Sequence, residues 1–338
     1  MNPELLNPAR LDATRLQEET VSSTPNTRLE AASRPLPSGP SALYRGGRWE
    51  ACVGISRVLP GSLLRAATKS LAGAYRLARP ARAGVVFNNL LPLLDGDGTA
   101  ARTATRALFG NFATKLADLW RYESGRSIDA LFGELTGWEH FEAARARGRG
   151  VLFVTVHLGN WEFGAPLLTR RGVRLQVITQ AEPDARLTAS RQAARARWGI
   201  ETLPLGDDPF AAVGILRSLE AGNAVALLMD RPPPPTAMTV KLFGQSIAAT
   251  SSAAALARAT GCALLPVYLP RTAAGYAVHA LPEIAYDRAA LRDPAARLAL
   301  TQRILSAFAP ALRSHPSQWY HFVPIWSDAG TSSHALPS

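Results

Sequence analysis

The hexapeptide from His157 to Glu162, His-Leu-Gly-Asn-Trp-Glu, contains the residues whose types and spacing point most directly to chemistry. A histidine with a carboxylate on one ring nitrogen keeps a fixed tautomer, and its imidazolium form is stabilised. The other ring nitrogen can then take a proton from an attacking hydroxyl, which is general-base catalysis of acyl transfer. We therefore predict His157 as the base and Glu162 as its charge partner. The alternative is a buried histidine bonded to a backbone carbonyl, with Glu162 in the solvated first turn of a helix.

A short strand has to position this histidine. Residues 151–156, Val-Leu-Phe-Val-Thr-Val, favour a buried strand, and the Gly-Asn pair after the histidine ends it. Ligands bind at the carboxyl edge of open α/β sheets, because loops and helix N-termini form a crevice there. On one continuous helix, His157 and Glu162 would point about 140° apart, so they can meet only where the chain bends at Gly159 and Asn160.

Strands and helices alternate in the rest of the chain. Further candidate strands lie at 175–178, 224–229 and 263–268, and helical stretches lie at 101–122, 185–197, 209–221 and 250–260. This alternation predicts an α/β fold in which helices flank a central mixed sheet.

Asp230 and Arg231 directly follow the predicted strand at 224–229, which places them at the same sheet edge as His157. In one interpretation, Arg231 holds a phosphate or an acyl carbonyl and Asp230 orients it. In the other, the two residues form an ordinary ion pair at the end of a strand. We favour the first and predict both as substrate-binding residues.

The chain of 338 residues carries 37 basic and 26 acidic side chains, for a net charge of +11. Only Lys69, Lys115 and Lys241 are lysines, so arginine supplies nearly all of the positive charge. Nucleic acid, an anionic membrane surface or an acidic carrier protein would each suit this balance. The basic residues are scattered and follow no helix-turn-helix, ribonucleoprotein or zinc-finger pattern, so we expect no nucleic-acid partner.

Residues 44–83 combine apolar positions with several arginines and predict N-terminal amphipathic helices, which would lie on an anionic membrane or pack on the domain. No apolar run approaches the roughly 18 to 20 residues that cross a bilayer, so the expected membrane contact is peripheral. The isolated Cys52 and Cys262 favour reduced core residues in the cytosol. We expect a disordered tail at 1–42, one domain at 43–327 and a flexible tail at 328–338.

Other chemistries have weaker support. The histidines show no metal-binding spacing, so no metal is expected. The segment Gly244-Gln-Ser-Ile-Ala248 lacks the second glycine of a nucleophile elbow, which argues against a covalent hydrolase. His315 and His321 are expected only to help pack the C-terminal tryptophans.

Several ordered blocks of the chain resemble the bacterial lipid A biosynthesis acyltransferase family, which is related to phosphatidylinositol mannoside and lysophospholipid acyltransferases. The resemblance covers about residues 45–327. The blocks are His157–Glu162, Asp230-Arg231, Leu242-Phe-Gly244, Leu256–Gly261 with Leu264–Val267, and His315-Pro-Ser-Gln-Trp319 with Trp326.

The resemblance implies a glycerolphosphate-acyltransferase-like fold and an O-acyltransferase activity, with no metal or redox cofactor. The acyl donor would be an acyl carrier protein or coenzyme A thioester, and the acceptor a hydroxyl of a membrane glycolipid or lysolipid, with a lipid A-type acceptor favoured. The family's H(x4)D/E motif falls on His157 and Glu162, and an arginine important in the family corresponds to Arg195 or Arg197. The implied location is peripheral, at the cytoplasmic face of the inner membrane.

Two departures from the family leave the acceptor open. Many relatives carry an N-terminal transmembrane anchor that this sequence does not show, and prolines follow Asp230 where lipid A enzymes more often have Asp-Gln.

The oxyanion of the reaction is expected to be stabilised by Arg231 or by backbone N–H groups around Gly159 and Asn160, and Asn160 is predicted to contact substrate. The non-enzymatic alternative is a peripheral lipid-binding protein with the same fold.

Overall fold

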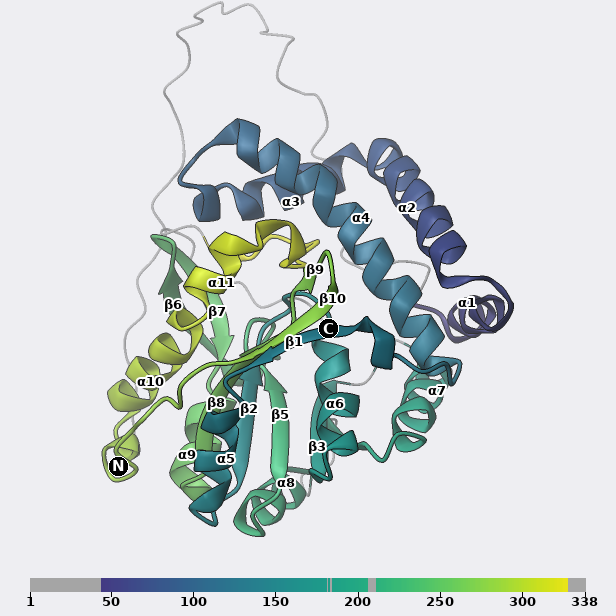
Figure 1. Ribbon diagram of the computed structural model, residues 1–338. Helices are drawn as coiled ribbons and strands as arrows, with labels where there is room; N and C mark the ends of the chain where they lie inside the picture. Colours follow the sequence, from purple (N-terminus) through teal and green to yellow (C-terminus); the bar gives the residue numbers. More distant parts are fainter. Residues whose placement is uncertain (1–43, 181, 183, 206–210, 328–338) are drawn as a thin grey trace, which may run out of the picture. The chain divides into compact units, whose positions relative to one another are not determined.

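A computed structural model gives the structure of residues 44–180, 182, 184–205 and 211–327 (Figure 1). The tails predicted at 1–42 and 328–338 lie outside the described residues. The described part of the chain begins with helices and continues into alternating strands and helices, as Figure 1 shows.

The main sheet of the described residues has eight strands in the order β1-β10-β8-β2-β5-β3-β4, with β9 paired to β10. Its central strands are parallel, and β10 runs antiparallel to β8, so the predicted mixed α/β sheet is confirmed. The strand bounds are β1 (Phe132–Thr136), β2 (Val151–Thr155), β3 (Leu175–Gln180), β4 (Glu201–Leu205), β5 (Ala224–Leu228), β8 (Ala263–Tyr268), β9 (Arg271–Thr272) and β10 (Gly275–Ala280). A smaller sheet contains β6 (Ala237–Leu242), β7 (Gln245–Thr250) and β11 (Trp326–Ser327).

Four helices precede the sheet, and α1, α2 and α3 all pack against α4. Their bounds are α1 (Gly46–Val58), α2 (Gly61–Ala78), α3 (Pro80–Leu90) and α4 (Gly98–Glu123). The later helices are α5 (Trp138–Ala146), α6 (Gly164–Arg170), α7 (Ala185–Ala196), α8 (Ala211–Glu220), α9 (Ser252–Thr260), α10 (Pro294–Ser306) and α11 (Ala309–Ser314). None of the described helices combines the length and apolar character needed to span a bilayer. The amphipathic character predicted for 44–83 stays a prediction.

Strand β2 is buried on both faces because β5 and β8 pair with its two edges and helices cover the sheet. Leu152 and Val154 join a core cluster that includes residues of α8, α9 and α10, whereas Val151 and Phe153 join a second cluster with residues of α5 and α6. Successive side chains of a strand point to opposite faces, so a strand covered on both sides needs an uninterrupted apolar run. This run carries the chain to His157 in the middle of the sheet edge.

Candidate active site

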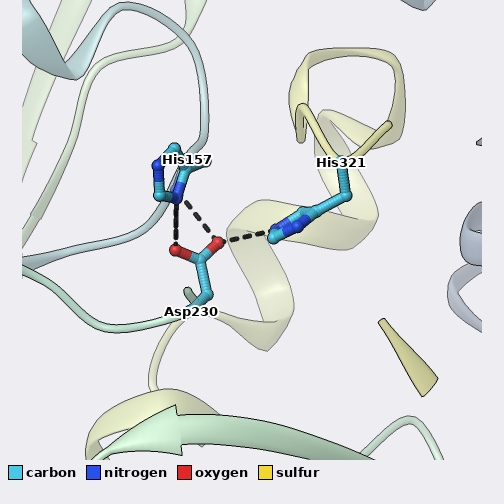
Figure 2. Close-up of side chains that lie close together, drawn as sticks. All are labelled: His157, Asp230 and His321. Atoms are coloured by element: carbon cyan, nitrogen blue, oxygen red, sulfur yellow. Dashed lines mark hydrogen bonds and ion pairs between the residues drawn. The ribbon is translucent and has the colours of Figure 1, made fainter. Parts of the chain in front are cut away.

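His157 and Asp230 meet because their strands are neighbours in register. Thr155 of β2 lies opposite Leu228 of β5. His157 lies two residues after Thr155, and Asp230 lies two residues after Leu228. The backbone N–H of His157 lies 3.0 and 3.2 Å from the two carboxylate oxygens, and Nδ1 lies 2.6 Å from Oδ1 of Asp230 (Figure 2). A carboxylate can only accept here, so Nδ1 carries the proton and Nε2 keeps a lone pair.

The Asp230 carboxylate also accepts hydrogen bonds from the C-terminal segment. Trp319 Nε1 donates to Oδ2 at 2.8 Å, and His321 Nε2 lies 2.9 Å from the same oxygen (Figure 2). Burial by itself would raise the pKa of Asp230, but its interactions with His157 and His321 hold that pKa well below its usual range. Asp230 is therefore an anion at the floor of the site, fixed by three residues from two segments of the chain.

Burial and the nearby Arg231 lower the pKa of His157 to about 3, although Asp230 acts in the opposite direction. The residue is 8% exposed and lines the cavity described below. His157 is thus held as a neutral imidazole with one nitrogen free to accept a proton, the state that a general base requires.

His321 was expected only to pack, yet it connects two of the predicted site residues. Its Nε2 meets Asp230, and its Nδ1 lies 3.4 Å from Nε of Arg231, which donates to it. The Arg231 guanidinium also donates to the backbone oxygen of Tyr320. No local pattern marks His321 or Trp319 as site residues, because both reach Asp230 only through the fold.

Glu162 has different partners from the one expected. It lies on the 3₁₀ helix η3 (Trp161–Phe163), and its carboxylate meets Arg191 at 2.6 Å and Arg195 at 3.2 Å. The two arginines share one face of α7 because they are four residues apart. Burial alone would raise the pKa of Glu162, but Arg191 and Arg195 hold that pKa far below its usual range. Within the described residues no hydrogen bond or ion pair joins Glu162 to His157.

Arg191 was missed by the sequence interpretation, which considered only Arg195 and Arg197. It is 7% exposed and contacts three carboxylates, Glu162, Glu123 and Glu182. Trp49 of α1 donates from Nε1 to Glu123 at 2.5 Å, which extends the network to the N-terminal helices. Arg191 therefore ties α1, α4, α7 and η3 together beside the cavity.

Replacing Arg191 with methionine is expected to lower the free energy of unfolding by about 3–5 kcal/mol, since removing one member of a buried ion network leaves its partners without compensation. Urea denaturation measures this loss. The matched control is Arg186→Met on the same helix, whose exposed side chain pairs with Glu50 and should change stability little. Equal unfolding midpoints for the two variants would show that the Arg191 network does not stabilise the fold.

The structure also shows the surroundings of three other groups that the sequence predicted for the site, namely the backbone amides after β2, the Asn160 side chain and Arg197. Gly159 donates its N–H to Gln318 O and Asn160 donates its N–H to Leu269 O, both at 2.9 Å, so these amides are not free for an oxyanion. Asn160 is fully buried and is not among the described residues that line the cavity. The Arg197 guanidinium donates to the backbone oxygen of Glu123 and likewise does not line the cavity as described.

Gly159 explains the shape of this loop. Its φ angle is +62°, and a Cβ atom there would lie 1.9 Å from Leu269 O. Only glycine avoids both the left-handed strain and this collision. The bend predicted at Gly159 is therefore present, and it directs Glu162 to the arginines of α7.

A cavity of about 1130 Å³ opens beside His157. Helices α1, α2 and α4 form one side of it and residues of the sheet form the other. Apolar side chains dominate its walls, among them Leu64, Leu71, Phe109, Leu116, Leu175 and Val177. A mostly apolar cavity with a few convergent polar groups is the usual form of a binding site for a lipid chain.

The side chains of His157, Asp230 and His321 offer ligand atoms within 4.8 Å of one another, although the sequence showed no metal-binding spacing. Asp230 already accepts hydrogen bonds from both imidazoles and from Trp319. The nitrogens that face the carboxylate carry protons, so this donor set suits a hydrogen-bonded relay better than a cation.

Fold and site together define an α/β protein that holds a buried histidine, bonded to an aspartate, beside a large apolar cavity. The chain belongs to the bacterial lipid A biosynthesis acyltransferase family, whose model matches residues 52–328. The predicted family is thereby confirmed.

Individual relatives are phosphatidylinositol mannoside acyltransferases. The chain is 30% identical to the one from Mycobacterium tuberculosis (strain CDC 1551 / Oshkosh) over 204 residues, which are 60% of this chain and 61% of the relative. It is 27% identical to that of Mycolicibacterium smegmatis over 229 residues, or 67% and 71% of the two chains. The match thus spans about three fifths of the M. tuberculosis protein.

Proposed function

We propose that this protein transfers a fatty acyl chain from a thioester donor to a hydroxyl group of a membrane glycolipid or lysolipid. The observation that carries the proposal is the neutral His157, oriented by Asp230 and placed beside the apolar cavity. Family membership supports the reaction class. The donor is an acyl carrier protein or coenzyme A thioester.

In the proposed reaction, Nε2 of His157 takes the proton of the acceptor hydroxyl, and the oxygen attacks the thioester carbonyl. Asp230 stabilises the imidazolium that forms. The tetrahedral oxyanion collapses, the carbon–sulfur bond breaks, and the departing sulfur takes the proton from His157. Arg231 is the group that we assign to the oxyanion, because it lines the cavity near His157 and the Gly159 and Asn160 amides are occupied.

The acceptor is the less constrained substrate. The relatives are named for phosphatidylinositol mannosides, whereas the family is named for lipid A, so both kinds of glycolipid belong in the assay. The charge partner first predicted, Glu162, remains a proposed participant that orients Arg191 and Arg195. Both arginines line the cavity. We propose that they contact substrate in the orientation that Glu162 gives them.

Incubating the purified protein with radiolabelled palmitoyl thioesters of acyl carrier protein and of coenzyme A tests the proposal. The acceptors are a phosphatidylinositol mannoside, a lipid A precursor and a lysophospholipid. The expected result is label in at least one acceptor. Thioester-independent lipid binding with no transfer to any acceptor would instead support the non-catalytic lipid-binding alternative.

We also propose a peripheral membrane contact through α1 and α2, at what the resemblance implies is the cytoplasmic face of the inner membrane. Large apolar side chains are exposed on these helices, namely Ile55, Val58, Leu63, Leu71, Tyr75 and Leu77. Arg65, Lys69 and Arg76 lie on α2 with several of them. Apolar side chains flanked by cations match the interfacial region of an anionic membrane.

Changing Leu71 and Leu77 together to glutamate should weaken binding to vesicles of phosphatidylcholine and phosphatidylglycerol on the order of tenfold or more, since each is 70% exposed and would leave the lipid phase. Vesicle co-sedimentation measures this change. Leu298→Glu on α10, where the leucine is 39% exposed, is the control. If Leu298→Glu weakened vesicle binding equally, α2 would not be the specific membrane contact.

A further inference from the structure

Lys115 is a buried cation inside the cavity. It lies on α4, is 4% exposed, and holds Nζ 3.3 Å from the centroid of the Trp161 ring. Among the described residues it forms no ion pair and no hydrogen bond. An ammonium taken out of water is costly unless an anion or several acceptors face it. The Trp161 ring, together with the Phe112 ring whose centroid lies 5.9 Å from Nζ, offsets only part of that cost.

The pKa of Lys115 also indicates that its ammonium form is incompletely compensated in the protein. Burial lowers the pKa of Lys115 to about 7, and the negative charge of Glu162 opposes this shift only in part. The charged form of Lys115 therefore lacks a full counter-charge in the protein as described. A bound anion would supply it.

The other cations of the cavity are already engaged. Within the described residues, the cavity lining contains five cationic side chains and two carboxylates. The cations are Arg82, Lys115, Arg191, Arg195 and Arg231, and the carboxylates are Glu162 and Glu182. Arg191 and Arg195 hold carboxylates, and Arg82 and Arg231 donate to backbone oxygens. Lys115 is thus the lining cation for which the described residues supply no ion pair or hydrogen bond, and a bound anion would supply one.

The position of Lys115 limits which substrate can supply this anion. The Trp161 ring under the ammonium also contacts His157, with ring centroids 4.7 Å apart. In a thioester donor, the whole pantetheine arm separates the phosphate from the carbonyl that must lie at His157. In a phosphorylated acceptor lipid the hydroxyl and the phosphate belong to the same headgroup, so no pantetheine arm separates them.

We propose that Lys115 binds a phosphate of the acceptor lipid and so positions the acceptor hydroxyl at His157. This inference rests on the proposed acyl transfer. A lysine ammonium binds phosphate as a compact point charge. The acceptor class is then a phosphoglycolipid or a lysophospholipid, as opposed to a neutral glycolipid.

The kinetic test compares Lys115→Met with Lys241→Met, a matched control in which the lysine is exposed on β6. The acceptors are a phosphatidylinositol mannoside and hexadecyl mannoside, which lacks phosphate. Loss of a charged contact should raise KM for the phosphatidylinositol mannoside about 10- to 100-fold in Lys115→Met. The values of kcat, KM for the thioester and KM for hexadecyl mannoside should stay at the wild-type level. An equal fall in kcat with both acceptors would overturn the proposal, because it would make Lys115 an oxyanion ligand.

A binding measurement keeps this inference separate from the proposed function. Calorimetric titration with a short-chain phosphatidylglycerol should give a Kd about 10- to 100-fold weaker for Lys115→Met than for the wild type, and octyl mannoside should show no difference. If the wild type transfers no acyl group, the proposed function fails while this titration still decides the phosphate site. Equal Kd values for wild type and Lys115→Met would overturn the site even if acyl transfer were found. Unfolding midpoints verify that both variants are folded.

Discussion

His157→Ala lowers kcat for acyl transfer by about 100- to 10,000-fold, the range that a positioned general base contributes. The expected loss follows from the geometry, because Nε2 of His157 is the proposed proton acceptor and Asp230 bonds the other ring nitrogen beside the cavity. The KM values for thioester and acceptor should change little, since the cavity walls and Lys115 remain. The measurement is initial-rate kinetics with the acceptor identified in the transfer assay.

His140→Ala is the matched control for this variant, since His140 lies on α5, away from the residues that line the cavity as described. Circular dichroism and urea unfolding should show that both variants keep the fold. If His157→Ala transferred acyl groups at the wild-type rate, the proposed mechanism would be wrong.

Asp230→Asn should lower kcat on the order of 1,000-fold or more, comparable with the loss seen when the carboxylate of a serine-protease triad becomes an amide. Asp230 accepts hydrogen bonds from His157, His321 and Trp319. An amide presents donors in place of one oxygen, so it would leave an N–H group unsatisfied or turn His157 to the wrong tautomer. It also could not stabilise the imidazolium.

Glu162→Gln separates the two carboxylates that have been considered as partners of His157. Glu162 contacts Arg191 and Arg195, so its variant should perturb the arginines and cost about tenfold in kcat, far less than Asp230→Asn. The opposite order, with a severe loss for Glu162→Gln and a mild one for Asp230→Asn, would restore Glu162 as the charge partner. Both variants are compared at the same saturating substrate concentrations.

The fold was largely predictable because its central strands have strong local patterns. The predicted strand at 263–268 agrees with β8, and those at 175–178 and 224–229 differ from β3 and β5 only at their ends. Strands β1, β4 and β10 were missed. The pattern in β1 mixes exposed and half-buried residues, and β4 contains Pro204, so their identity as strands depends on pairing with distant neighbours.

The predicted site illustrates the limit of local spacing. Both His157 and Asp230 were expected at one sheet edge, but their direct contact depends on β2 and β5 being adjacent and in register, which no local pattern specifies. Glu162 was attractive because it is near His157 in sequence, yet the packing of α7 gave it other partners. Lys115 could have been recognised from the sequence as a cation on a buried helix face. It lies three residues after Phe112 and four before Leu119, on a face that is otherwise apolar.

The donors around Asp230 also have a consequence for the order in which the protein becomes active during synthesis. His157 and Asp230 emerge from the ribosome long before Trp319 and His321, and the sheet that holds the first two is already encoded by then. Domains form as the nascent chain lengthens. A chain interrupted after β10 would contain the base and its carboxylate but lack two of the groups that hold them. Translation therefore supplies Trp319 and His321 only after the sheet has been made. An incompletely synthesised chain lacks these two donors to Asp230.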